Sequence, residues 1–182
     1  MTGRMTGIRA VAAAAAFAVA GVLAGAAPAQ AAVSDHCLVA VDDPDGGVCY
    51  ATFDEARAAF LAMGGQISES KHPASGARAG LISLPTLLMI GYDSTGQNPF
   101  GGTDWFYGYY GGCTTTTADV DYQVTAIKTA WKNVISSTTL FSNCWANLYA
   151  DTNFGGSSTG YQGSKSSLSA ALNNNAESIR FS

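Results

Sequence analysis

The sequence predicts a mainly β fold in which two sheets pack face to face. Only 12% of its 182 residues are charged, and it is rich in Gly, Ser, Thr and Asn, a composition typical of all-β proteins with many turns. Short runs of β-branched and aromatic residues alternate with turn-forming segments. An aromatic hairpin pattern occurs twice in the second half of the chain. Two such units can bury the apolar face that each one would expose alone.

The clearer copy of the hairpin pattern lies in the segment 146–157. Tyr149, Phe154 and Gly156 follow one another at spacings of five and two residues, and Ser178 stands just before a short strand-like run. A strand that folds over on itself at Phe154 needs a glycine nearby, because glycine enters positive φ without a steric clash. The serine hydroxyl would then bond backbone groups that the sharp bend leaves unpaired. The pattern therefore predicts a folded hairpin that is closed by a serine from the last strand.

This order of aromatic, four residues, aromatic, one residue, glycine and a late serine resembles one Greek key of the βγ-crystallin family. An upstream copy is degenerate. In it, Tyr92 is followed by Phe100 and Gly102, with three extra residues between the aromatics, and Ser137 takes the place of the late serine. The resemblance implies a two-Greek-key βγ-crystallin-like sandwich in residues 84–182.

Two segments precede this domain, and the resemblance covers neither of them. Residues 1–31 combine basic residues, a short Ala-rich apolar stretch and a small-residue ending, which is typical of a secretory signal peptide rather than a membrane anchor. Residues 32–83 predict a small N-terminal hairpin-plus-helix extension, in which the helix begins with the capping box Thr52 to Glu55 and a linker follows. We therefore expect a secreted, extracellular protein that is not bound to a membrane.

Charge and motif content exclude several classes of function. Without Arg4 and Arg9 of the leader, seven of the nine basic side chains remain against 13 acidic ones, a net charge of −6. No basic stripe is left to bind phosphate, so nucleic acid is not an expected partner. The sequence has no His-Glu-x-x-His, no Gly-x-Ser-x-Gly and no phosphate-binding loop, so we expect no enzymatic activity and assign no catalytic residue. We expect a monomer.

All four cysteines follow the predicted leader, and their even number indicates disulfide bonds in an exported protein. Three pairings are possible. We favour Cys37 with Cys49 and Cys113 with Cys144, because each pair brackets one local segment.

The resemblance also implies calcium binding. Members of the family often hold Ca²⁺ through a closing-loop motif of two Asn or Asp residues, two variable residues, Ser or Thr, and Ser. Here the two loops, 132–137 and 173–178, each depart from the motif once, at Lys132 and at Glu177. Because calcium takes oxygen ligands, Glu177 can replace a hydroxyl, whereas the Lys132 ammonium would repel the ion unless it turned outward.

The candidate calcium ligands are Asn133, Ser136, Asn174 and Glu177, with Asp93 and Asp151 of the hairpin turns as additional oxygen donors. The alternative interpretation is that these residues only hold turns together.

A long segment inside the first key, 103–130, contains a run of aromatic residues. It predicts either a functional loop or a core strand whose aromatic side chains alternate. The chain is also similar to small microbial metalloproteinase inhibitors that share the crystallin fold. A disulfide-anchored loop suits an inhibitor, because such a loop has little ordering entropy left to lose on binding. The candidate inhibitory loop contains Tyr109, Tyr110, Cys113 and Thr114.

Three functions are therefore open. The leading hypothesis is a secreted βγ-crystallin-like binding or structural protein that is stabilised by calcium. The second is an inhibitor of secreted proteases, with an extracellular protease as its partner. The third is a killer-toxin-like role, which is known for other proteins that resemble this fold; no residue here indicates it.

Overall fold

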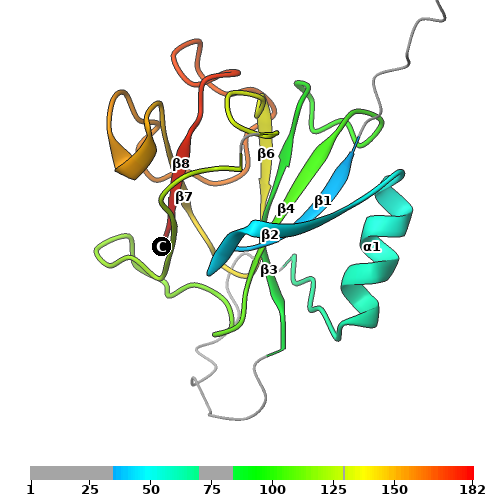
Figure 1. The fold of residues 1–182 in the computed structure, drawn as a ribbon. Helices are drawn as coiled ribbons and strands as arrows, with labels where there is room; N and C mark the ends of the chain where they lie inside the picture. The colour runs from blue at the N-terminus through cyan, green and yellow to red at the C-terminus, as the bar shows by residue number, and fades with distance from the viewer. Residues whose placement is uncertain (1–34, 70–83, 129) are drawn as a thin grey trace, which may run out of the picture. The chain divides into compact units, whose positions relative to one another are not determined.

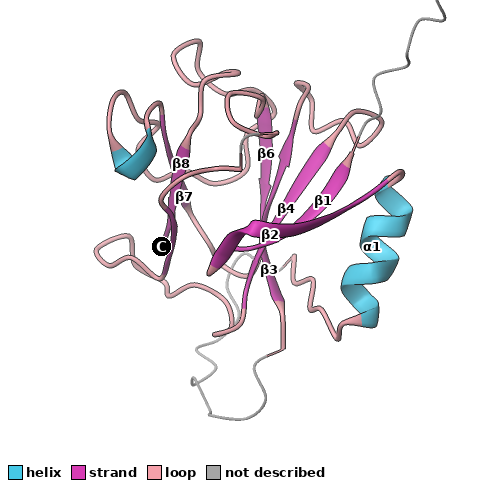
Figure 2. Ribbon diagram, viewed as in Figure 1, coloured by secondary structure: helices cyan, strands magenta, loops and turns pink. Residues whose placement is uncertain are grey.

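Two β-sheets carry the fold within residues 35–69, 84–128 and 130–182, the part of the chain that the computed structural model describes (Figure 1). The five-stranded sheet has the order β2 (Asp43–Tyr50), β1 (His36–Ala40), β4 (Thr103–Gly108), β3 (Thr86–Tyr92) and β6 (Ser137–Leu140). The three-stranded sheet has the order β5 (Tyr122–Val124), β8 (Ser178–Phe181) and β7 (Ala146–Tyr149). The helices of this part are α1 (Phe53–Ala62) and the 3-10 helix η1 (Thr152–Phe154) (Figure 2). The predicted mainly β class is confirmed.

The predicted signal peptide, residues 1–31, lies outside the described residues. Among the residues that are described, no helix is long and apolar enough to cross a membrane.

Each Greek key contributes a segment to the sheet of the other key. In the first key, β3 pairs with β4 and β6 in the five-stranded sheet, whereas β5 pairs with β8 in the other sheet. In return, Lys165 of the second key forms an antiparallel bridge to Thr138 of β6, while Gln162 bridges back to Ala146 of β7. Each sheet therefore contains a segment of the other key, and the keys cannot separate without breaking sheet hydrogen bonds.

The N-terminal hairpin and helix are present as expected, but they enlarge the five-stranded sheet instead of standing apart from it. β1 pairs in parallel with β4 and antiparallel with β2, and the Cys37–Cys49 disulfide joins the hairpin across one register pair. β1 is buried on both faces, since Cys37 and Val39 face one core and Leu38 faces the other. A strand with two apolar faces needs cover on both, which places it inside a sheet. The described residues of the extension and of the two keys accordingly form one compact unit.

Helix α1 covers the outer face of the five-stranded sheet. It begins at the predicted capping box, where the Thr52 hydroxyl accepts the Glu55 N–H and the Glu55 carboxylate accepts the Thr52 N–H, both at 3.2 Å. Phe60 is fully buried, and its ring lies 6.1 Å from that of Trp105 on β4. Figure 1 shows α1 on one side of this sheet and β7 and β8 on the other.

The aromatic run of β4 alternates between two cores. Trp105 and Tyr107 face α1, whereas Phe106 packs between the two sheets, 6.4 Å from the ring of Phe181. The first part of the segment 103–130 is therefore a core strand, which leaves its later residues as the candidate loop.

Asp104 brings a carboxylate into this interior. The side chain is 0% exposed, and neither oxygen has a hydrogen-bond partner in the described part of the chain. Burial raises the pKa of Asp104 well above its ordinary value, and the charge of Lys128 only partly opposes this effect. The folded state therefore favours the neutral acid, so this residue lowers the stability of the fold as the pH rises above the ordinary pKa.

The hairpin of the second key has the geometry that its pattern predicts. Phe154 and Gly156 adopt positive φ values of 64° and 69°, and the rings of Tyr149 and Phe154 meet edge to face at 5.6 Å. The Ser178 hydroxyl accepts the Phe154 N–H at 3.0 Å and donates to the Asp151 carbonyl at 2.7 Å. The late serine thus bonds both backbone groups at the bend.

The first key repeats this arrangement with a different residue at the bend. The Ser137 hydroxyl donates to the Ser94 carbonyl at 2.6 Å and accepts the Gln97 N–H at 3.0 Å. Gln97 lies five residues after Tyr92 and has a φ of 56°, so it corresponds to Phe154. Tyr92 and Ser137 therefore hold the places that the resemblance implies.

The predicted roles of Phe100 and Gly102 are wrong. Phe100 is 90% exposed and belongs to the loop after the bend. Gly102 is buried against Trp131, and its N–H donates to the Asp93 carboxylate at 2.8 Å. The bend requires a backbone N–H and a positive φ but no second aromatic ring, so a search for aromatic spacing selected the wrong residue.

We predict that Ser178→Ala lowers the free energy of unfolding by about 1–3 kcal/mol, because it leaves the partly buried Phe154 N–H and Asp151 carbonyl without their partner. Urea unfolding of the oxidised protein measures this change. Ser157→Ala is the matched control, since Ser157 is exposed in the same hairpin. Equal stability of the two variants would contradict a structural role for the closing serine.

Candidate functional site

The two closing loops, 132–137 and 173–178, lie side by side, and each donates an equivalent backbone hydrogen bond to the other. The Asn133 N–H donates to the Ala176 carbonyl, and the Asn174 N–H donates to the Ile135 carbonyl, both at 3.0 Å. Both asparagines adopt positive φ, 60° and 54°. Asparagine tolerates this region better than most residues, which accounts for its place at the second position of each loop. The loops are therefore related by an approximate twofold exchange of contacts.

The first contact region, which we call the Ser136 site, consists of Asp93, Ser136 and Asn174. The Ser136 side chain is 3% exposed, and its hydroxyl lies 2.9 Å from both the Asp93 carbonyl oxygen and the Asn174 Oδ1. The neighbouring Asn173 has a buried Oδ1 with no hydrogen-bond partner among the described residues. The Ser136 site thus brings together neutral oxygen atoms from one hairpin and both closing loops.

The second contact region, which we call the Glu177 site, consists of Lys132, Asn133 and Glu177. The Lys132 ammonium lies 2.8 Å from one oxygen of the Glu177 carboxylate, and the Asn133 amide donates to the other at 3.1 Å. The Lys132 hydrogen bond is the main reason why the pKa of Glu177 is lowered; partial desolvation opposes it and the Asn133 amide reinforces it. This site therefore already holds a cation of the chain itself.

These contacts correct how the candidate ligands are grouped. The sequence places one departure from the six-residue motif in each loop. In the structure, however, each site combines the fifth residue of one loop, Ser136 or Glu177, with the second residue of the other loop. Lys132 and Glu177 therefore meet at the same site, and both closing-loop residues of the Ser136 site agree with the motif.

The two hairpin aspartates contribute less than expected. Asp93 reaches the Ser136 site through its backbone carbonyl, while its carboxylate bonds the Gly102 N–H. Asp151 contributes its carbonyl to Ser178. Within the described ranges, no group of three or more His, Cys, Asp and Glu side chains could hold a metal ion. Any cation at the Ser136 site would depend on amide, hydroxyl and backbone oxygens.

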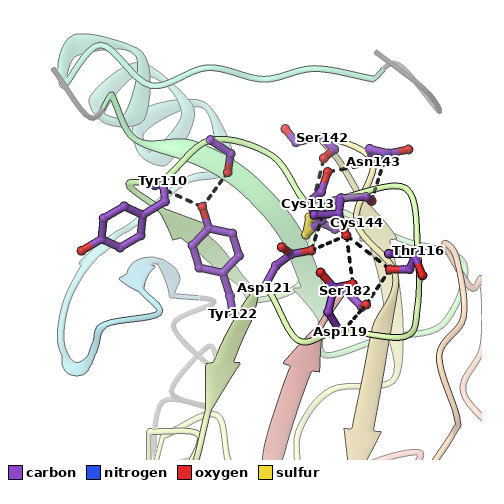
Figure 3. The surroundings of a disulfide bond; sticks show 12 residues. Tyr110, Cys113, Thr116, Asp119, Asp121, Tyr122, Ser142, Asn143, Cys144 and Ser182 are labelled. Atoms are coloured by element: carbon purple, nitrogen blue, oxygen red, sulfur yellow. Dashed lines mark hydrogen bonds between the residues drawn. A yellow bond between two sulfur atoms is a disulfide. The ribbon is translucent and has the colours of Figure 1, made fainter. Parts of the chain in front are cut away.

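A second candidate site is the segment 109–121, which we call the anchored loop (Figure 3). The predicted Cys113–Cys144 disulfide is confirmed and ties the loop to the turn before β7. Beside it, the Cys113 N–H donates to the Ser142 carbonyl at 3.0 Å, and the Asn143 amide donates to the Thr114 carbonyl at 2.7 Å. Gly112 permits this close approach, because a Cβ there would lie 2.5 Å from the Ser142 carbonyl oxygen.

The remaining anchors hold both ends of the loop. The Tyr122 hydroxyl donates to the Gly111 carbonyl at 2.6 Å and accepts the Tyr110 N–H at 3.1 Å. At the other end, the Asp121 carboxylate accepts the Thr114 N–H at 2.8 Å. The Ser182 hydroxyl donates to the carbonyls of Thr116 and Asp119, as Figure 3 shows. The disulfide and these hydrogen bonds therefore fix the loop at several points along its length.

The outer surface of the anchored loop is partly aromatic. Tyr110 is 66% exposed and Tyr109 is 36% exposed, whereas Cys113 is buried. Burial, reinforced by the hydrogen-bonded Tyr109 hydroxyl, raises the pKa of the adjacent Tyr107 to about 12, so Tyr107 stays neutral at any physiological pH. Of the four residues expected in an inhibitory loop, the two tyrosines face solvent and the other two serve as anchors. Sequence reasoning missed the anchors Asp121, Tyr122, Asn143 and Ser182.

An aromatic groove of about 820 Å³ lies on the outer side of the five-stranded sheet, beside α1. Phe53, Trp105, Phe141 and Trp145 are among the residues that line it, together with Arg57. Of the site residues expected from sequence, only Tyr92 and Cys144 reach its wall. The groove could not be predicted from the sequence because its residues come from six separate segments.

No protein-family model matches the sequence, and no curated protein matches it. Among solved structures, a βγ-crystallin domain from Flavobacterium johnsoniae is 24% identical and covers 52% of this chain and 93% of its own, with a TM-score of 0.36. The N-terminal domain of protein S is 20% identical, with coverages of 52% and 94% and a TM-score of 0.38. A βγ-crystallin domain from Clostridium beijerinckii is 14% identical, with coverages of 52% and 95% and a TM-score of 0.37.

These TM-scores are below 0.5, so the assignment of the fold depends on the structure of this chain. The folded hairpins, their closing serines and the segments that each key contributes to the other sheet support it. The described residues form a βγ-crystallin-like pair of Greek keys with an N-terminal hairpin and helix built into one sheet.

We predict that Tyr122→Phe loosens the start of the anchored loop while the core remains folded, because the ring stays buried and only the hydroxyl is lost. Amide exchange at Tyr110 should accelerate at least tenfold, corresponding to the loss of about 1.4 kcal/mol of local stability. Hydrogen–deuterium exchange measures this, with Tyr50→Phe as a control that removes a hydroxyl from outside the network. Unchanged exchange in the segment 109–112 would show that the hydroxyl does not hold the loop.

Proposed function

We propose that the protein is a secreted βγ-crystallin-like structural and binding protein that takes one calcium ion, at the Ser136 site. One observation carries the proposal: the Asn174 amide oxygen and the Asp93 carbonyl oxygen each lie 2.9 Å from the Ser136 hydroxyl oxygen. Calcium prefers such hard oxygens. Secretion is supported by the composition of the predicted leader and by the two disulfides, which persist in oxidising compartments.

The role of the ion in this proposal is mechanical. Asp93 belongs to the hairpin of the first key, Ser136 to its closing loop and Asn174 to the closing loop of the second key. Ligands from all three segments would join the two keys at their contact, so calcium would stabilise the folded state. Because the side-chain ligands are neutral, we expect weak affinity, with a Kd of about 0.1–1 mM as in extracellular calcium modules.

We predict that millimolar calcium raises the unfolding temperature of the protein relative to chelator. At about 10 times the Kd, which millimolar calcium reaches, binding to the folded state alone stabilises it by about 1.4 kcal/mol. Asn174→Gly should abolish the rise, because it removes the amide oxygen and still permits the positive φ. Asn153→Gly is the matched control, since Asn153 is exposed and also has positive φ. Scanning calorimetry decides the matter, and an identical response to calcium in both variants would exclude the Ser136 site.

The second candidate function is inhibition of an extracellular protease by the anchored loop. It is supported by the disulfide and hydrogen bonds that fix the loop in advance, with Tyr109 and Tyr110 exposed on its surface. A preorganised loop loses little entropy when it enters a protease cleft, and tyrosine gives a large contact area from a stiff side chain.

We predict that the oxidised protein inhibits a thermolysin-type metalloprotease at near-stoichiometric concentration and that Tyr110→Ala weakens the inhibition at least tenfold. Val48→Ala serves as control, because Val48 is an exposed apolar residue on β2, outside the loop. Residual protease activity is titrated against each variant. If no protease of any class is inhibited, the second candidate fails and the calcium proposal is unaffected.

A further inference from the structure

The two closing-loop sites have the same backbone frame but different contents. In each, the second-position asparagine of one loop lies beside the fifth-position side chain of the other. At the Ser136 site these side chains are an amide and a hydroxyl. At the Glu177 site they are an amide and a carboxylate, and Lys132 is added. The Glu177 site therefore has an extra negative charge and an extra positive charge, both supplied by the chain.

Lys132 and Asn133 together engage both oxygens of the Glu177 carboxylate, at 2.8 Å and 3.1 Å. The side chain of Glu177 is only 16% exposed, whereas that of Lys132 is 39% exposed. A metal ion could bind this carboxylate only by displacing the ammonium, and two cations at one carboxylate would repel each other. The residues as they stand do not fit calcium at the Glu177 site.

We propose that the Lys132 ammonium acts as a built-in cation at the Glu177 site, holding the two closing loops together without metal and masking a second divalent-cation site. The ammonium takes the place that a metal would hold between the loops, because it neutralises Glu177 of one loop from the first position of the other. Replacing Lys132 then exposes a carboxylate beside the Asn133 amide. The unmasked site takes a hard, oxygen-preferring ion, and its charged ligand makes it the stronger of the two sites.

This inference rests on the proposed function only for the choice of calcium as the ion. The alternative is an ordinary surface ion pair that neither closes a site nor stabilises the loops, since such pairs often contribute little. Counting the bound ions separates the two.

The test is the number of calcium ions bound by the oxidised protein and by Lys132→Asn, measured by calorimetric titration with calcium chloride and by equilibrium dialysis. Asparagine at this position is a residue that the closing-loop motif accepts. We expect Lys132→Asn to bind one ion more than the unsubstituted protein. In chelator its unfolding temperature should be lower, and added calcium should restore it.

Two further variants keep the test specific. Lys165→Asn removes the same charge from an exposed position and should bind the same number of ions as the unsubstituted protein. Adding Glu177→Gln to Lys132→Asn should remove the gained ion. Circular dichroism in chelator verifies that every variant is folded.

The possible counts distinguish this inference from the calcium proposal. If the unsubstituted protein binds no ion and Lys132→Asn binds one, the Ser136 proposal fails and the masked site stands. If both bind one ion and unfold at the same temperature in chelator, the masked site is overturned and the Ser136 proposal stands.

Discussion

The fold depends on a single hydrogen-bonding arrangement, in which a serine on each closing strand holds a hairpin folded. Ser137 and Ser178 each donate to the carbonyl two residues after the hairpin tyrosine and accept the N–H five residues after it. A hydroxyl donates and accepts at the same time, so one small side chain satisfies both backbone groups. Both serines are completely buried, so water cannot replace them. This contact therefore joins the hairpin to the closing strand in each key.

The exchange of segments between the keys explains where the candidate cation sites form. Because each key contributes a segment to the other sheet, the closing loops meet at the contact between the keys and bond one another reciprocally. Each site then combines residues from both loops. The two residues that depart from the motif, Lys132 and Glu177, therefore lie together and form an ion pair.

This geometry also sets the limit of what the sequence could predict. The capping box at Thr52 and the Cys37–Cys49 disulfide could be predicted because their residues are near in sequence. The second hairpin and the Cys113–Cys144 disulfide could be predicted because their residues have a recognisable spacing or bracket one segment. The first hairpin was misread because its bend is defined by backbone conformation, which Gln97 supplies without an aromatic ring. The grouping of ligands into sites depends on which loop faces which, and spacing within one loop contains no such information. The buried Asp104 likewise gives no local signal.

The same comparison of the two keys indicates which part of the molecule is free to carry a specific function. In the second key, the segment that passes from one sheet to the other is short, because Gln162 bridges to β7 and Lys165 already bridges to β6. In the first key, the equivalent crossing runs from Gly108 to Tyr122 and contains the anchored loop. The fold does not need this length, since the shorter crossing joins the same two sheets. The disulfide and the network of side-chain hydrogen bonds therefore order a long loop that the fold itself does not require, which is the property that the proposed inhibitory role depends on.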